Sequence, residues 1–382
     1  MIADLAAIAA QLRQSTSVIG SALATVLDTD DGPGGSRRSG RPSGGTPPRR
    51  SGRPGATGRD ADPLTRIAIL RGTDKWGPHF YTPVYHELFQ HLRELPIRLL
   101  EIGVGGHESP RLGGASLLMW ADYFPLARIV GIDVTEKQLH PHPRITILRG
   151  SQADPQFLAQ VVAGHGPFDI VIDDGSHVPA DVEASFNALF PAMADDGFYV
   201  IEDVQTAFWP RFGGSPGDGA ETMALARGAL EAVNHAEIVV ANPQWSPPPT
   251  AASLRGLRAY HNLLVFQKGD NREPSTRAFD AADSHVSGAI ALMEQALAAM
   301  PTPEGLANLA RTYALARVFD KAIDTVKRGL ERWPDNLELL AVGAKTGRRV
   351  PGDALGAQCL ERLRTVAASD PYLDELIRKS SE

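Results

Sequence analysis

The chain has 382 residues, 43% of them hydrophobic, and a formal net charge of −7, so it exceeds a usual single core and gives no reason to expect a nucleic-acid partner. Its one cysteine, Cys359, excludes a disulfide within the chain and a thiolate metal cage. No apolar run approaches the roughly 20 residues of a membrane span, and the first residues lack the basic start of a secretory signal, which together predict a cytoplasmic protein.

Two segments of contrasting composition open the chain. Residues 1–30 carry Ala, Leu, Ile and Val at helical spacing, and we predict an N-terminal helical segment there. Residues 31–62 consist largely of Gly, Pro, Ser and Arg, and the run Arg37 to Pro42 recurs as Arg49 to Pro54. Such a segment cannot bury enough surface to offset its chain entropy, which favours a disordered linker over a phosphate-binding or membrane-binding tract.

Strand and helix patterns alternate over residues 63–272, which we predict to be the catalytic domain. The predicted strands are 98–104, 128–134, 144–149, 168–172, 198–201, 236–241 and 262–267. Helical patterns lie between most of them, at 116–124, 154–162, 180–193 and 221–234. This order predicts an α/β, Rossmann-like class of fold, a mostly parallel sheet with helices on both faces. Ligands of such sheets bind beyond the carboxyl ends of the strands.

The C-terminal residues, 283–382, follow a different rhythm. Met300-Pro301, Trp333-Pro334 and Asp370-Pro371 each close an amphipathic segment, and residues 304–317 and 320–332 form a predicted helix pair. The spacing is close to the period of about 34 residues of tetratricopeptide repeats. The pattern predicts a short all-helical, tetratricopeptide-like extension, with an ordinary helical tail as the alternative. A short array is marginal alone, so we expect it to pack on the catalytic domain or on a second protomer in a homo-oligomer, or to bind a protein partner.

A glycine-rich turn follows the first strand of the sheet, within the run Leu99 to Gly106. Glycines let the backbone approach a nucleotide-type ligand closely, and the next helix offers unpaired N–H groups. The second strand ends at Asp133, where a carboxylate can accept hydrogen bonds from both ribose hydroxyls. This combination favours an adenosine-bearing cofactor over a tight turn without a ligand.

The positions of the glycines distinguish a dinucleotide site from an S-adenosylmethionine site. A dinucleotide fingerprint would have a third glycine near the position of Glu108. Glu101, Gly103 and Gly105 instead resemble the first motif of class I S-adenosylmethionine-dependent methyltransferases, which implies that Glu101, Gly103 and Asp133 lie in the cofactor site.

Acidic clusters follow two predicted strands that are neighbours in the chain. The first is the run Asp173 to His177, and the second is the pair Glu202 and Asp203. Carboxylates that share one crevice repel each other unless a cation or a proton intervenes. Oxygen ligands at Asp174, Glu202 and Asp203 favour Mg²⁺ or a similar hard ion.

A metal and a histidine in this crevice suit methyl transfer to a hydroxyl group. The hydroxyl is a poor nucleophile while it is protonated. A divalent cation lowers its pKa, and a nearby histidine can take the proton. We predict that His177 is this base; the alternatives are a metal ligand and a surface residue beside a helix cap.

Four ordered motifs over residues 64–270 carry a specific resemblance: Gly72 to Thr82, Leu99 to Gly106, Val171 to His177 and Ile201 to Asp203. Together they resemble the macrolide deoxysugar O-methyltransferases of the mycinamicin and macrocin pathways. The resemblance implies an S-adenosylmethionine- and Mg²⁺-dependent enzyme of antibiotic biosynthesis that methylates a sugar hydroxyl.

Site roles follow from the resemblance, motif by motif. It implies metal ligands at Asp174, Glu202 and Asp203, and a general base at His177. The implied cofactor-binding residues are Thr73, Lys75, Tyr81, Glu101, Gly103, Gly105, Asp133 and Asp173, of which Asp173 has the least defined role. His107 stands where one version of the first motif ends in glycine, and the linker and the tail have no expected counterpart in these enzymes. These departures leave the substrate open.

Substrate contacts are expected from residues 205–218, which are rich in aromatic and glycine residues. Aromatic faces stack on sugar rings, and a glycine-rich segment can move as a lid. We assign Trp209 and Arg211 to this wall and Tyr85 to the opposite one. The alternative is that the aromatic side chains anchor the loop to the core.

The sequence as a whole predicts an O-methyltransferase that uses S-adenosyl-L-methionine and Mg²⁺ and acts on a sugar hydroxyl of a glycosylated natural product or glycan. Methylation of a catechol or a polyketide phenol is the alternative within the same chemistry. An NAD-dependent oxidoreductase and a non-catalytic repeat scaffold are the alternatives of a different class.

Overall fold

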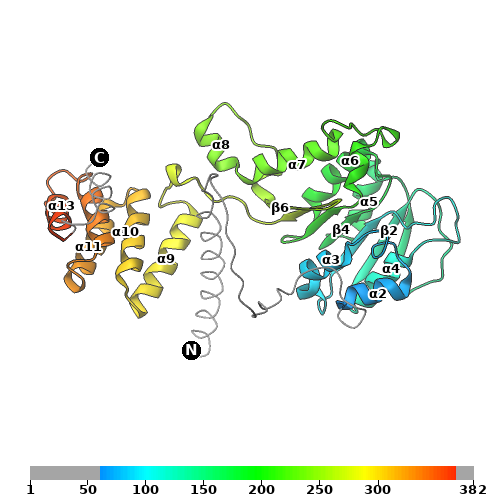
Figure 1. The fold of residues 1–382 in the computed structure, drawn as a ribbon, viewed down its shortest axis with the longest axis horizontal. Coiled ribbons are helices and arrows are strands. Elements are labelled where there is room, and N and C mark those ends of the chain that lie inside the picture. Colours follow the sequence, from blue (N-terminus) through cyan, green and yellow to red (C-terminus); the bar gives the residue numbers. More distant parts are fainter. Residues whose placement is uncertain (1–60, 367–382) are drawn as a thin grey trace, which may run out of the picture. The chain divides into compact units, whose positions relative to one another are not determined.

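A computed structural model describes residues 61–366 of the chain. The predicted helical segment 1–30, residues 31–60 of the predicted linker and residues 367–382 lie outside the described residues. Within the described part, one seven-stranded sheet is followed in the chain by a group of helices (Figure 1).

The sheet has the strand order β3-β2-β1-β4-β5-β7-β6. Its strands are β1 (Arg98–Ile102), β2 (Arg128–Asp133), β3 (Ile145–Arg149), β4 (Ile170–Asp173), β5 (Phe198–Ile201), β6 (Leu254–Tyr260) and β7 (Leu263–Lys268). The first five strands pair in parallel, whereas β7 runs antiparallel to both β5 and β6. The predicted mostly parallel sheet is therefore confirmed, and β1 and β4 form its centre.

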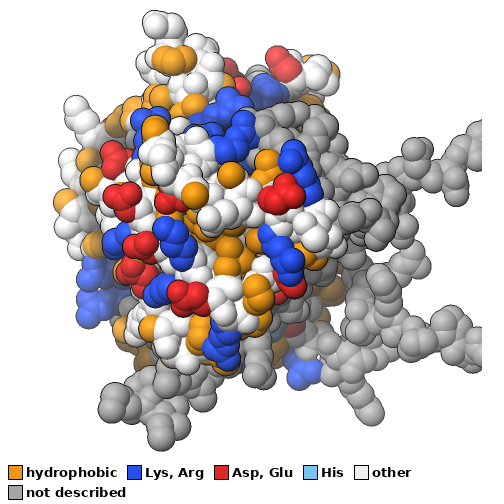
Figure 2. All heavy atoms as spheres, turned by 90° about the vertical axis from the view of Figure 1, so that its left-hand side faces the viewer, with side chains coloured by type: hydrophobic (Ala, Val, Ile, Leu, Met, Phe, Trp, Pro, Cys, Tyr) orange, Lys and Arg blue, Asp and Glu red, His pale blue; other side chains and the backbone are white. Residues whose placement is uncertain are grey.

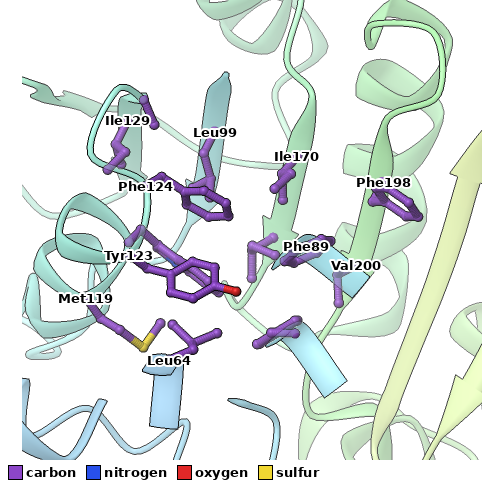
Figure 3. Packing of buried hydrophobic residues seen from close by; sticks show 14 of the residues in the cluster. Leu64, Phe89, Leu99, Met119, Tyr123, Phe124, Ile129, Ile170, Phe198 and Val200 are labelled. Atoms are coloured by element: carbon purple, nitrogen blue, oxygen red, sulfur yellow. The ribbon is translucent and has the colours of Figure 1, made fainter. Parts of the chain in front are cut away.

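Helices cover both faces of this sheet because successive strand residues point to opposite sides. Leu99, Ile170 and Val200 pack with α2 (Pro63–Arg71), α3 (Thr82–Phe89) and α4 (Ala115–Tyr123), as Figure 3 shows. Their neighbours Leu100 and Val171 pack on the other face, against α5 (Pro155–His165), α6 (Pro179–Leu189) and α7 (Ala220–Val233). Short 3-10 helices are Gln90–Leu92, Phe190–Ala192, Val204–Phe208, Pro210–Phe212, Ala251–Ser253 and Thr276–Ala278.

Two predictions at one edge of the sheet are wrong. Residues 236–241, predicted as a strand, lie in the helix α8 (His235–Ala241), and the strand β6 was predicted as no element at all. The place beside β5 is taken by β7, with β6 outside it. The strand β6 lies at the edge of the sheet, where one side meets solvent and polar residues are tolerated. It contains Arg255, Gly256 and Arg258, so its sequence lacks the apolar pattern of a buried strand.

The helices that follow the sheet are α9 (Ser284–Ala299), α10 (Pro303–Leu315), α11 (Phe319–Arg332), α12 (Leu337–Gly347) and α13 (Leu355–Val366). They have apolar cores of their own, and the predicted helix pair is confirmed as α10 and α11. Their tetratricopeptide-like character remains a prediction. Among residues 61–366, every helix is too short or too polar to span a membrane.

Candidate functional site

The two acidic clusters emerge from neighbouring strands. In the parallel pair of β4 and β5, Asp173 is opposite Ile201, so Asp174 and Glu202 begin adjacent loops at the same edge of the sheet. The strand β1 lies on the other side of β4 and ends at this edge too. The expectation that the acids share one crevice is confirmed, since ion pairs with a single lysine connect them.

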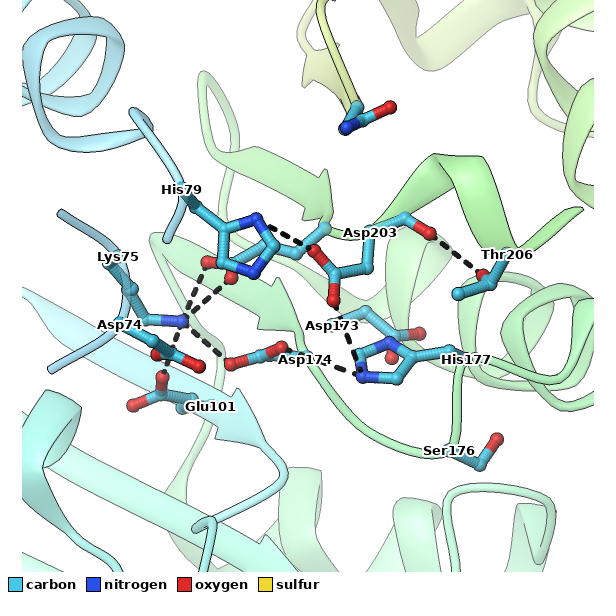
Figure 4. Close-up of polar contacts among 12 residues, drawn as sticks. Asp74, Lys75, His79, Glu101, Asp173, Asp174, Ser176, His177, Asp203 and Thr206 are labelled. Atoms are coloured by element: carbon cyan, nitrogen blue, oxygen red, sulfur yellow. Dashed lines mark hydrogen bonds and ion pairs between the residues drawn. The ribbon is translucent and has the colours of Figure 1, made fainter. Parts of the chain in front are cut away.

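That lysine is Lys75, which is 1% exposed and lies among three carboxylates (Figure 4). Its Nζ is 2.8 Å from Asp174 Oδ2 and from both carboxylate oxygens of Glu202, and 3.2 Å from Glu101 Oε1. Burial alone lowers the pKa of Lys75, but the three negative charges outweigh it and raise that pKa well above its usual value. One ammonium thus balances three carboxylates, which leaves the cluster short of positive charge.

Glu101 is the most isolated of these acids. It is fully buried in β1, and neither of its oxygens accepts a hydrogen bond, so its contact with Lys75 is an electrostatic one. Burial raises the pKa of Glu101 from 4.5 to about 7, and the charge of Lys75 opposes this shift.

Glu202 is held from two sides. Tyr85 donates its hydroxyl to Glu202 Oε1, in addition to the two contacts from Lys75. Burial and the charge of Asp174 raise the pKa of Glu202 well above its usual value. Tyr85 itself has no exposed surface, so its contact is with an acid of the site, whereas we expected a contact with substrate.

Asp203, in contrast, faces the crevice. Tyr81 donates its hydroxyl to Asp203 Oδ1 at 2.7 Å, and His79 Nδ1 lies 3.4 Å from the same oxygen. Burial, followed by the hydrogen bond to Asp203, raises the pKa of Tyr81 above its usual range. The other oxygen, Oδ2, is 3.8 Å from His177 Nε2.

Asp174, His177 and Asp203 can present one ligand atom each within 4.8 Å of one another. Their side chains are 24%, 22% and 18% exposed, so they are accessible from the crevice. His177 and Asp203 have left-handed backbones, with φ of 58° and 52°. Such conformations are uncommon outside glycine and concentrate at functional sites. Oxygen and imidazole donors without a thiolate suit a hard divalent cation, and the excess negative charge of the cluster favours one.

Asp173 has a different environment from its neighbour. It is 1% exposed, and it accepts hydrogen bonds from Gln152, Ser185 and Tyr199. Burial raises the pKa of Asp173 to about 6, although these donors oppose the shift. Its contacts tie the end of β4 to α6 and β5, while its predicted part in cofactor binding remains a prediction.

A cavity of about 880 Å³ lies beside the acids, at the carboxyl ends of β1, β2 and β4. Its lining includes Thr73, Gly103, Gly105, Asp133 and His177. Predicted cofactor residues from three separate motifs therefore line one cavity.

Gly103 is required at this point by packing. Its φ is 89°, and a Cβ atom added to it would lie 2.0 Å from the carbonyl oxygen of Asp174. The turn after β1 and the turn after β4 therefore touch backbone to backbone. On the opposite side, Asp133 accepts hydrogen bonds from the N–H groups of Val104 and Thr135, which orient its carboxylate.

The segment expected to contact substrate forms two 3-10 helices beside His177. Arg211 lies over the rings of Trp209 and Phe212, at 4.7 and 5.0 Å, and the ring of Phe212 is 6.3 Å from that of His177. Trp209 is 40% exposed. This wall next to the acids thus offers an exposed aromatic face and a guanidinium group.

Sequence reasoning missed how the segment from Thr73 to Tyr81 is used. Lys75 and Tyr81, two of the implied cofactor-binding residues, contact the acids of the other two motifs. His79 was not assigned a role. The only signal was a lysine between Asp74 and Trp76, which does not reveal a partner about 100 residues further along the chain.

No family model matches the chain. It is 45% identical over 222 residues to the 8-demethyl-8-(2-methoxy-alpha-L-rhamnosyl)-tetracenomycin-C 3'-O-methyltransferase of Streptomyces olivaceus, which covers 57% of this chain and 56% of that relative. It is 43% identical over 214 residues to the mycinamicin VI 2''-O-methyltransferase of Micromonospora griseorubida, with 55% and 53% covered. The chain spans a little over half the length of these curated relatives.

The solved structures agree. The MycE methyltransferase from the mycinamycin biosynthetic pathway, in complex with Mg, SAH and mycinamycin VI, matches with a TM-score of 0.54 and 38% identity over 60% of each chain. Over this part the chain resembles sugar O-methyltransferases. The predicted resemblance is confirmed in sequence and fold, and the sheet is that of class I methyltransferases.

The buried Lys75 yields a prediction on stability. Lys75→Met leaves Glu101, Asp174 and Glu202 without their cation, and we expect the free energy of unfolding to fall by about 3–5 kcal/mol. Urea denaturation in the presence of a chelator measures this. Adding Glu202→Gln to Lys75→Met should restore part of the loss; an unchanged midpoint in the single variant would contradict the central role of Lys75.

Glu101 yields a prediction on pH. Because its folded pKa of about 7 is above the ordinary 4.5, the folded state retains a proton that the unfolded state releases between these values. Its contribution to stability is complete below pH 4.5 and is lost as the pH rises through 7. Glu101→Gln should remove this fall, so the stability difference between variant and parent, measured in urea with a chelator, should increase from pH 5 to pH 8. A constant difference would show that Glu101 keeps an ordinary pKa.

Proposed function

We propose that the chain is an O-methyltransferase that transfers a methyl group from S-adenosyl-L-methionine to a sugar hydroxyl of a glycosylated natural product, with Mg²⁺ as its metal. The observation that carries this proposal is the cluster of Asp174, His177 and Asp203 beside a cavity lined by Gly103 and Asp133. A cavity lined by predicted cofactor residues and a cluster of donors for a hard cation thereby share one edge of the sheet.

The similarities support the same chemistry. The relatives named above are O-methyltransferases of glycosylated tetracenomycin and of mycinamicin, and the solved relative contains Mg and SAH. Deoxysugars on polyketide products are therefore the proposed substrate class.

For the metal, we propose Asp174 and Asp203 as direct ligands, since both are accessible from the crevice. Glu202 was predicted as the third ligand. Its side chain is 2% exposed and already has Lys75 and Tyr85 as donors, which favours a role as the buried counter-charge behind the metal ligands. Bound Mg²⁺ would supply Lewis acidity that lowers the pKa of the acceptor hydroxyl.

The proposed role of His177 is to hold the proton that the acceptor hydroxyl loses. Its Nε2 lies between Asp174 and Asp203, at 3.9 and 3.8 Å, so a proton taken up there would face both carboxylates. The hydroxyl oxygen then forms a bond to the methyl carbon while the carbon–sulfur bond breaks, and the sulfur keeps that electron pair. Trp209 and Arg211 would orient the sugar on the open side of the crevice.

The first test is on cofactor and metal. We expect calorimetry to show binding of S-adenosylmethionine but not of NAD, and EDTA to abolish methyl transfer to mycinamicin-type glycosides while cofactor binding survives. Full activity in excess EDTA would contradict the metal mechanism.

His177 can be tested separately for its two possible roles. As the base, His177→Ala should lower kcat by about 100-fold or more and remove the acidic limb of the pH–rate profile, with Mg²⁺ affinity retained. As a ligand, it should weaken Mg²⁺ binding instead. A parallel loss of Mg²⁺ affinity and kcat would therefore reassign His177 to the metal.

The two acids after β5 offer a matched comparison. Asp203→Asn should weaken Mg²⁺ binding by at least about 10-fold, which is the lower end reported for perturbed metal sites. Glu202→Gln keeps the shape of the side chain and should chiefly affect stability. An equal loss of Mg²⁺ affinity in both variants would return Glu202 to the set of direct ligands.

We also propose that the C-terminal helices bind a protein partner, because repeat-like helices present extended surfaces rather than a catalytic crevice.

A further inference from the structure

A second cavity, of about 580 Å³, lies among the C-terminal helices and shares no residue with the catalytic crevice. Its walls come from α10, α12, the turn after α10 and the segment before α9. Five of its lining residues are cations: Arg277, Arg311, Arg317, Lys345 and Arg349. We call this cavity the basic groove.

No acidic residue lines the basic groove, and none of its five cations forms an ion pair with another residue of the range 61–366. Other cations of the same helices are paired. Lys321 lies 3.6 Å from Glu294, and Arg362 lies 2.6 Å from Asp335. The chain as a whole carries a net charge of −7, so the groove is a local concentration of positive charge in an acidic protein. Such a concentration attracts anionic groups over a distance.

Figure 2 shows a face of the helical part on which charges of both signs are mixed. There, Lys and Arg side chains stand among Asp and Glu side chains and exposed hydrophobic ones. Mixed charges of this kind are an ordinary solvated surface. The basic groove differs because its cations have no acidic neighbours in its lining.

Arg317 adds an independent feature. Its φ of 61° is left-handed, in the turn between α10 and α11, where glycine would fit without strain. An arginine at this position places a cation in the groove at a cost in backbone energy.

The groove also has apolar walls. Leu315 is 42% exposed, and Val342 lies in the lining beside it. No aromatic residue lines the groove, so a nucleotide base would find no ring to stack on. A volume of this size exceeds what one phosphate ion needs and lies within the range of about 300–1,000 Å³ that is usual for ligand pockets.

We propose that the basic groove binds an acidic peptide segment of a partner protein. Carboxylates of the segment would pair with the guanidinium groups of Arg311 and Arg317 and with Lys345, and an apolar side chain would pack on Leu315. The proposal states where the suggested protein partner binds and which chemical class it belongs to. Peptide binding can be measured without cofactor or metal, so its failure would be distinguishable from a failure of the proposed methyl transfer.

The test uses the full chain and fluorescence anisotropy. The probe is a labelled peptide of alternating Glu and Leu, about eight residues long, and its control replaces every Glu by Gln. We expect the Glu peptide to bind at least about 10-fold more tightly than the Gln peptide, and its affinity to fall as salt rises. Equal affinity for both peptides would overturn the proposal.

Variants locate the binding. Lys345→Glu and Arg311→Glu should each weaken binding of the Glu peptide by about 10-fold. Arg364→Glu makes the same charge change on α13 outside the groove and should leave binding intact. Arg317→Gly removes a cation and also relieves the left-handed backbone, so its loss of affinity should come with an unchanged or higher melting temperature. Equal losses in Arg364→Glu and Lys345→Glu would contradict the location.

Two further outcomes would assign the groove to another ligand. Displacement of the peptide by tripolyphosphate at equal charge concentration would make it a polyphosphate site. Residues 367–382 contain Asp374 and Glu375. Tighter peptide binding in the variant Asp374→Asn/Glu375→Gln would show that the chain's own acidic residues compete for the groove, and would overturn the partner.

Discussion

The buried ammonium of Lys75 is the interaction on which the proposed active site depends. It lies within 3.2 Å of carboxylates from three separate motifs, on β1, after β4 and after β5. Without a cation at this point, three acids at the edge of one sheet would repel each other, and burial would make that repulsion stronger. Lys75 therefore joins the segment before α3 to the centre of the sheet and holds Asp174 at the crevice, while Tyr81 from the same segment holds Asp203.

Strand order explains why the chemistry gathers here. The central strands β1, β4 and β5 are parallel neighbours, so their carboxyl ends bring together residues that are up to about 100 positions apart in the chain. The backbone contact of Gly103 with the Asp174 turn connects the cavity at the carboxyl ends of β1, β2 and β4 with the acidic cluster. His177 and Asp203 complete the arrangement with left-handed backbones, which are strained locally. The hydrogen bond from Tyr81 helps to hold Asp203 in this conformation.

The neighbouring acids Asp173 and Asp174 show how one fold gives two identical side chains different uses. The carboxylate of Asp173 points into the packing of β4, β5 and α6, where three donors hold it. The carboxylate of Asp174 leaves the strand and enters the crevice. Burial separates the two, since a fully buried acid with protein donors serves the fold, whereas an accessible one can meet a metal ion or substrate.

Residues that are close together in the chain suffice to predict the alternating strands and helices, the glycine-rich turn, the two acidic clusters and the resemblance to sugar O-methyltransferases. These features are local, because apolar periodicity and short motifs reside in consecutive residues. The folded chain shows four features that the sequence does not: Lys75 lies among the acids, Tyr85 is buried, residues 236–241 form a helix and five cations share one groove. Each of these features depends on which distant segment of the chain a residue contacts in the fold. The hydrophobic pattern of one stretch of chain does not specify that distant segment.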